Sequence, residues 1–80
     1  MRLRFDASVA HRVREAVWHR SQTLTELDGG GVELTVRVAG IVEIQPWILS
    51  WGAAVEVLEP ADLREAVATA VHSAAGRYAT

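Results

Sequence analysis

The chain has 80 residues, half of them hydrophobic, with a formal net charge of −2 and no cysteine. One small domain with a real core is expected, and the balanced charge argues against a general nucleic-acid binder, which needs a concentrated basic face. Without cysteine the chain has neither disulfides nor thiolate metal sites, which fits a cytoplasmic setting. We expect no membrane contact and no signal peptide, because no apolar run approaches the roughly 18 residues of a membrane span.

Hydrophobic periodicity predicts strands and a helix in the first half of the chain. Alternating apolar and polar side chains are typical of strands, whereas apolar residues three and four apart share one face of a helix. Three glycines after Asp28 fit a hairpin turn, because glycine adopts positive φ freely. We therefore predict a strand at 2–5, a helix at 7–17 capped by Asp6 or Ser8, an edge strand at 22–27, a turn at 28–31 and a strand at 32–38.

The second half is organised around a stretch with two tryptophans, Pro46–Gly52. Helical spacing puts both on one face of a helix predicted over 41–51, where Pro46 either kinks the helix or begins its regular part. Gly52 is a plausible end of that helix because it tolerates left-handed backbone. A strand is predicted at 54–58, followed by a third helix that begins at Pro60 and runs to about Tyr78.

This order predicts an α+β fold, a ferredoxin-like β-α-β-β-α-β antiparallel sheet with an extra C-terminal helix, in which the first and third strands are central. The predicted core comprises Leu3, Phe5, Val13, Leu34, Val36, Ile44, Ile48 and Val57. The other face of the sheet shows Arg2, Arg4, Glu33, Thr35, Arg37 and Glu56. The third helix has a flat, alanine-rich apolar stripe of Leu63, Ala66, Val67, Ala70, Ala74 and Tyr78.

Side chains that could carry chemistry are sparse and poorly placed. The three histidines lack metal-ligand spacing, and Ser21 lacks the context of an activated nucleophile. The glycine run joins two strands instead of opening a helix, so it is not a phosphate loop. We expect no catalytic residue, no metal, no cofactor and no enzymatic activity.

Two kinds of binding residue are candidates. Arg2, Arg4 and Arg37 could bind an anionic ligand or nucleic acid on the open sheet face; the simpler interpretation is a solvated face balanced by glutamates. Trp47 and Trp51 are assigned to the core or its edge. The candidate interface residues are Trp18, which follows the first helix, Thr35 on the open face and Tyr78 at the end of the third helix.

The chain resembles the C-terminal extension (WCX) domain of WYL-type bacterial transcriptional regulators. The likeness covers nearly the whole chain, and its most specific part is the tryptophan-glycine segment together with Val-Leu-Glu-Pro downstream. The matching segments are Leu3-Arg4-Phe5, Trp18-His19-Arg20-Ser21-Gln22, Asp28-Gly29, Glu43–Gly52, Val55–Pro60 and Leu63-Arg64.

The resemblance implies a piece of a longer regulator that also has a DNA-binding winged helix-turn-helix and a ligand-sensing WYL domain. Neither signature is present in these 80 residues, so DNA is expected to be contacted only through other domains of the parent protein. The expected role is a non-catalytic module that forms a homodimer and couples the WYL sensor domain to the dimer. The alternative is an open-sheet binding module that uses the three arginines.

Overall fold

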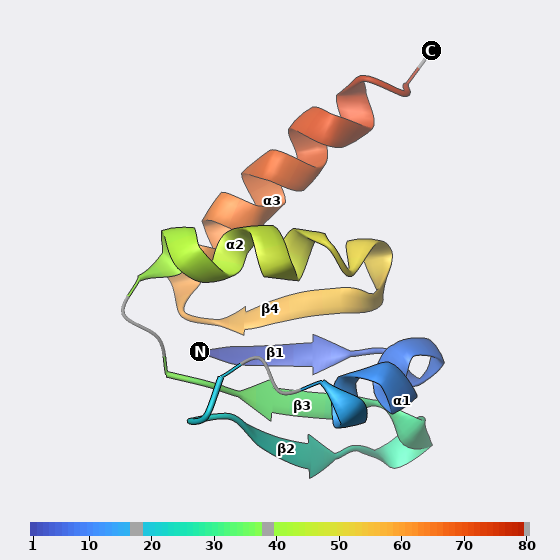
Figure 1. The fold of residues 1–80 in the computed structure, drawn as a ribbon. Coiled ribbons are helices and arrows are strands. Elements are labelled where there is room, and N and C mark those ends of the chain that lie inside the picture. The colour runs from blue at the N-terminus through green and yellow to red at the C-terminus, as the bar shows by residue number, and fades with distance from the viewer. Residues whose placement is uncertain (17–18, 38–39, 80) are drawn as a thin grey trace.

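The computed structural model describes residues 1–16, 19–37 and 40–79, which form a four-stranded sheet and three α-helices (Figure 1). In chain order the elements are β1 (Arg2–Phe5), α1 (Ala7–Glu15), β2 (Thr23–Glu26), β3 (Val32–Thr35), α2 (Ile41–Leu49), β4 (Val55–Glu59) and α3 (Ala61–Gly76). Short 3-10 turns at Asp28–Gly30 and Gly52–Ala54 precede β3 and β4. The predicted mixture of helices and antiparallel strands is thus confirmed.

The sheet is antiparallel throughout, and its strands lie in the order β2-β3-β1-β4. β1 and β3 are central, as predicted. Leu3 lies opposite Leu34 on one side and Val57 on the other. Because side chains alternate between the two faces of a strand, this register gathers the apolar residues of all four strands on one face.

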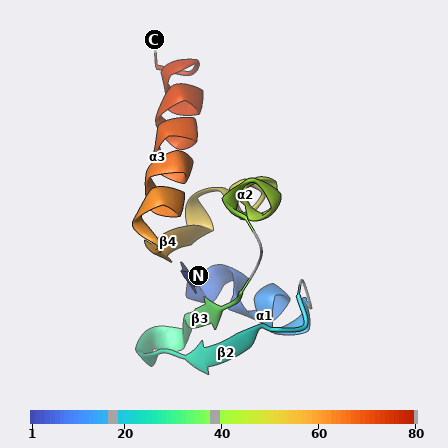
Figure 2. The same cartoon turned by 90° about the vertical axis from the view of Figure 1, so that its left-hand side faces the viewer.

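Helices α1 and α2 cover that apolar face, and Figure 2 shows both on the same side of the sheet. All eight predicted core residues are buried, and Val9, Ala10, Val32 and Leu63 join them in one cluster. No polar or charged residue of the described part is buried. The core is therefore a single apolar cluster between the sheet and helices α1 and α2, to which α3 adds Leu63.

Helix α1 is shorter than predicted. It ends at Glu15, and Ala16 turns into extended backbone while its N–H still bonds to the carbonyls of Arg12 and Val13. Asp6 occupies the predicted N-cap position, but its side chain makes no capping hydrogen bond. The backbone N–H of Val9 bonds instead to the Asp6 carbonyl, which closes the first turn.

Helix α2 runs through Pro46 instead of beginning near it. A proline has no N–H for the carbonyl four residues earlier, that of Val42, whose side chain points to solvent. Packing of Ile44 and Ile48 in the core offsets this lost bond. The helix ends at Leu49, and after one more turn Gly52 adopts a left-handed φ of 61°, which sends the chain into β4.

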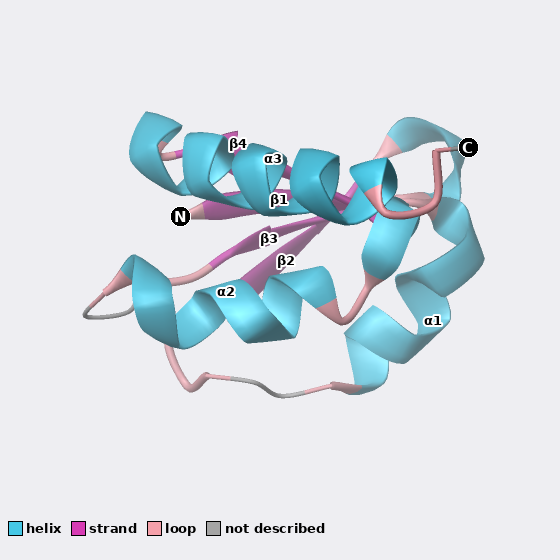
Figure 3. Ribbon diagram, turned by 90° about the horizontal axis from the view of Figure 1, so that it is seen from above, coloured by secondary structure: helices cyan, strands magenta, loops and turns pink. Residues whose placement is uncertain are grey.

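Helix α3 is anchored at its beginning and projects at its end. Pro60 is its N-cap and not its first residue, and the fully buried Leu63 fixes the first turn beside β4 and α2. The helix ends at Gly76, and Tyr78 follows in a final turn. Figures 1 and 3 show the helix beside α2 and rising beyond β4 without crossing the open face of the sheet.

Candidate functional site

The open sheet face carries arginines that are already paired with carboxylates. Arg2 Nε lies 3.0 Å from an oxygen of Glu59, and its Nη1 lies 3.8 Å from an oxygen of Glu33. Arg4 lies 4.0 Å from Glu56. The pairs are solvent-exposed, so each adds little stability. They do neutralise this face, so an anion arriving here would compete with a carboxylate for each of these two arginines.

Arg64 links the first turns of α3 to the edge strand β4. Its guanidinium donates to a Glu56 oxygen at 2.9 Å and to the Val57 carbonyl at 2.7 Å. The hydrogen bond from Arg64, helped by the positive charge of Arg4, holds the pKa of the Glu56 carboxyl below its ordinary value. The Val57 carbonyl belongs to the outer strand of the sheet, so this contact also covers part of an otherwise open edge.

Arg37, the third predicted ligand residue, lies just past the end of β3. Its side chain is exposed and makes no ion pair within the described ranges, while its backbone is tied to Ser21. The Arg37 N–H donates to the Ser21 hydroxyl oxygen at 2.9 Å, and this oxygen lies 3.0 Å from the Arg37 carbonyl. β1 therefore brings Arg2 and Arg4 together, and no described contact joins Arg37 to them.

A hydrogen-bonded turn at His19–Gln22 holds Ser21 in place. The Ser21 N–H donates to His19 Nδ1 at 3.0 Å, so this ring nitrogen carries a lone pair and acts as an acceptor. The side-chain amide nitrogen of Gln22, Nε2, donates to the Ala16 carbonyl at 2.9 Å and thereby ties the turn to the end of α1. His19 and Ser21 thus have structural partners, and no three His, Asp or Glu residues in the described ranges could share a metal ion.

Three aromatic rings pack edge to face at the boundary between core and solvent. Trp51 lies 5.2 Å from Phe5 and 5.7 Å from Trp47, measured between ring centroids. Arg12 of α1 stacks its guanidinium 5.3 Å from the centroid of the Trp51 ring. Both tryptophans are half-buried, so their assignment to the core edge is confirmed. The cluster joins α1 to α2.

The predicted interface residues have separate locations. Thr35 lies on the open face, where it is paired with Arg2 in β1 and Thr23 in β2. Tyr78 lies past the end of α3 with 86% of its surface exposed. Trp18 lies outside the described residues, so its prediction stands as made. Thr35 in the central strand β3 and Tyr78 after α3 thus belong to elements far apart in the chain.

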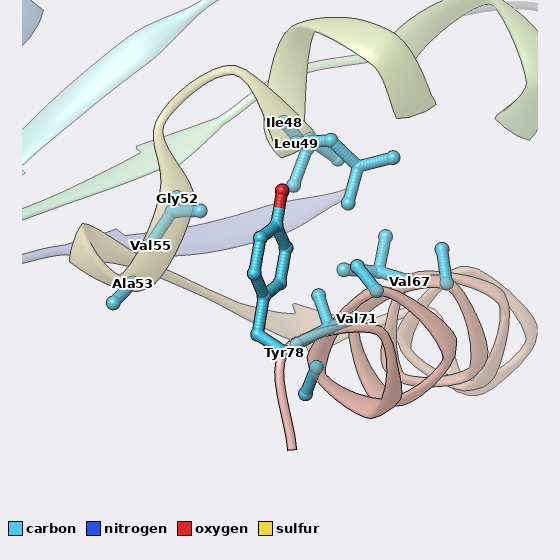
Figure 4. Close-up of a pocket in the computed structure, with 11 residues that line it drawn as sticks. Ile48, Leu49, Gly52, Ala53, Val55, Val67, Val71 and Tyr78 are labelled. Carbon is cyan, nitrogen blue, oxygen red and sulfur yellow. The ribbon is translucent and has the colours of Figure 1, made fainter. Parts of the chain in front are cut away.

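An apolar groove lies between the C-terminal end of α2 and the second half of α3. It has a volume of about 510 Å³, and one wall consists of Val67, Ala70, Val71, Ala74 and Ala75 of α3 together with Tyr78, which follows the helix. Leu49 and Ala53 belong to the opposite wall. Figure 4 shows the Tyr78 ring reaching over the groove toward Leu49. No residue of the lining is charged, and the Tyr78 hydroxyl is its one polar side-chain group.

The sequence points to only one wall of this groove. The stripe on α3, including Tyr78, follows from helical spacing. Leu49 and Ala53 were missed, because the angle between α2 and α3 depends on tertiary packing and not on local periodicity. Val71 was also missed, although its spacing of four residues from Val67 places it on the same face of the helix and was the available signal.

Comparison with known families gives a match to the WCX domain over residues 1–75. The chain therefore belongs to the WCX domain family, as its resemblance predicted. No curated protein matches the chain. None of the described helices is long and apolar enough to cross a membrane.

Proposed function

We propose that this chain is a non-catalytic regulatory and dimerisation module of a WYL-type helix-turn-helix transcriptional regulator in the cytoplasm. Membership of the WCX family over residues 1–75 carries this proposal. In it, the domain couples a WYL sensor domain of the parent protein to a homodimer. DNA is contacted only by other domains, and the chain needs no cofactor.

The architecture supports a protein-contacting role. We describe the sheet as ferredoxin-like because β1 and β3 are central and two crossover helices share one face. On the open face each of Arg2 and Arg4 has a carboxylate partner, which leaves little unpaired charge there for a ligand. The groove beside α3 instead presents apolar surface to solvent, which is typical of protein contacts.

The mass of the isolated chain in solution tests the dimerisation part of this proposal. A monomer has a mass of 8.7 kDa. Light scattering coupled to size exclusion should show the average mass rising toward twice that value as concentration increases from about 10 µM to about 1 mM. A constant monomer mass over this range would contradict dimerisation by this domain.

The anion-binding alternative remains a separate prediction. If Arg2, Arg4 and Arg37 bound single-stranded nucleic acid, the affinity would fall steeply with salt, because bound arginines release counterions from the phosphates. A titration with labelled single strands at low salt tests this directly. We expect no binding, since the glutamates compete for two of the three arginines; tight, salt-sensitive binding would favour the alternative.

A further inference from the structure

The two edges of the sheet are covered to different degrees. On the β4 edge, α3 packs beside the strand and Arg64 donates to the Val57 carbonyl. The other edge is β2, which is the outermost strand, and Figure 1 shows none of the described elements beyond it. Its sequence, Thr-Leu-Thr-Glu, has neither the proline nor the lysine that often keeps an open edge from pairing. The sheet can therefore be extended at β2.

The register of the β2–β3 hairpin shows which backbone groups of β2 face outward. The Leu27 N–H donates to the Gly31 carbonyl at 2.9 Å, and these two residues continue the register of the two strands as a hydrogen-bonded pair. Bonded and non-bonded pairs alternate along antiparallel strands. Thr25 is therefore bonded to β3, whereas the N–H and C=O groups of Leu24 and Glu26 point away from the sheet.

These outward groups match one kind of partner. They recur on every second residue, about 7 Å apart, which is the repeat of an extended strand. A helix cannot satisfy them, because its own N–H and C=O groups are bonded within the helix. A segment that bonds to both Leu24 and Glu26 must therefore be extended, as in recognition by strand addition.

The side chains of the edge restrict the partner further. Leu24 is half-buried and packs against the core, so an apolar residue should lie beside it. Residues 21–31 contain two carboxylates, Glu26 and Asp28, and no basic residue. Arg14 pairs with Glu26, while Asp28 makes no ion pair in the described ranges. A basic side chain at this end of the strand would complement the remaining negative charge, which a second copy of β2 cannot do.

We propose that β2 binds an extended polypeptide segment that pairs antiparallel with it and adds a strand to the sheet. The segment has an apolar residue opposite Leu24 and a basic residue close to Glu26 and Asp28. Antiparallel pairing continues the pattern of the existing strands. This surface lies outside the apolar groove, and the inference does not rest on the proposed dimerisation.

A synthetic peptide, acetyl-Thr-Arg-Thr-Val-Thr-Val-amide, tests the edge in a magnetic resonance titration of the isotope-labelled 80-residue chain. In the antiparallel register its arginine lies opposite Glu26 and its first valine opposite Leu24. With about 5 mM peptide, the amides of Leu24 and Glu26 should exchange with water at least about threefold more slowly. The amides of Thr23 and Thr25, already bonded to β3, should not change.

Two variants of one residue isolate the backbone contribution. Glu26→Pro removes an outward N–H, whereas Glu26→Ala removes the same carboxylate and its pair with Arg14 but keeps the N–H. Proline is tolerated in an edge strand where its missing N–H would face solvent. Glu26→Pro should bind the peptide about three- to tenfold more weakly than Glu26→Ala, because one hydrogen bond is lost.

Each outcome decides the inference. Protection confined to Leu24 and Glu26, with weaker binding by Glu26→Pro than by Glu26→Ala, supports strand addition at β2. No protection with the peptide, equal protection of all β2 amides, or equal binding by two folded variants would show it to be wrong. If circular dichroism shows that Glu26→Pro is unfolded, the wild-type pattern alone decides. Protection of Leu24 and Glu26 that rises with protein concentration and without peptide would identify a second copy as the occupant, which would overturn this inference while supporting dimerisation.

Discussion

Ser21 joins two loops that are distant in sequence. Its hydroxyl oxygen contacts both backbone groups of Arg37, while its own N–H is bonded to His19. Ser21→Ala removes the contacts to Arg37 and leaves the Arg37 N–H without its hydroxyl partner. We expect a loss of about 1–2 kcal/mol in the free energy of unfolding, measured by urea denaturation.

Ser73 provides the control for the Ser21→Ala substitution. Ser73 is exposed on α3 and has no hydrogen bond from its side chain among the described residues. Ser73→Ala should therefore change the unfolding free energy by no more than about 0.5 kcal/mol. Equal effects of the two exchanges would mean that Ser21 does not hold the loops together.

Glu26 and Arg14 form a bidentate pair between β2 and α1, with distances of 2.6 and 2.9 Å. These hydrogen bonds hold the pKa of the Glu26 carboxyl below its ordinary value of 4.5. A carboxyl whose pKa is lower in the folded state stabilises the fold fully above its unfolded pKa. That stabilisation is lost as the pH falls from about 4.5 through the lowered folded value.

The pH dependence of unfolding tests this pair. Between about pH 7 and about pH 3, the urea midpoint of Glu26→Gln should fall less than that of the wild type. Glu65→Gln changes an exposed carboxylate of α3 that makes no ion pair in the described structure. The urea midpoint of this control should fall with pH as much as that of the wild type. An identical pH profile for Glu26→Gln and the wild type would show that the pair is not maintained in solution.

At the level of elements, α3 depends on one side chain. Leu63 is completely buried, whereas Val71 two turns later is 47% exposed. Leu63→Ala should destabilise the domain by about 2–5 kcal/mol, because it leaves a cavity under the first turn of the helix. Val71→Ala should change the stability of the monomer by about 0.5 kcal/mol or less. Thermal unfolding at low concentration distinguishes them, and equal losses would contradict this anchoring.

The elements with clear periodicity were predictable from sequence. Alternation placed β1 and β3, and helical spacing identified Ile44 and Ile48 as core residues. The sequence predicted a helix over 41–51 but left open whether its regular part begins near Pro46, because local propensity opposes a proline inside a helix. Only burial of its other residues offsets the lost hydrogen bond. The bond from Arg64 to the Val57 carbonyl was also missed, since it depends on how α3 leaves β4.

The molecule as a whole has three different surfaces. One sheet face is buried under α1 and α2, and the opposite face carries arginines paired with glutamates. The groove beside α3 is apolar and open to solvent. Sequence identified the arginines and Tyr78 one by one. The sequence also predicted that Glu33 and Glu56 balance this face, and both do pair with its arginines. It did not give the individual pairs or the contact of Arg2 with Glu59, because strand register sets those contacts. Nor could it tell that Tyr78 borders a groove.

Hydrogen exchange at two concentrations tests the account most directly. If the domain dimerises, amides on its contact surface should exchange more slowly at about 1 mM than at about 10 µM. Amides of β1 and β3, already protected in the core, should not change. Exchange that is independent of concentration at every amide would contradict self-association of this domain.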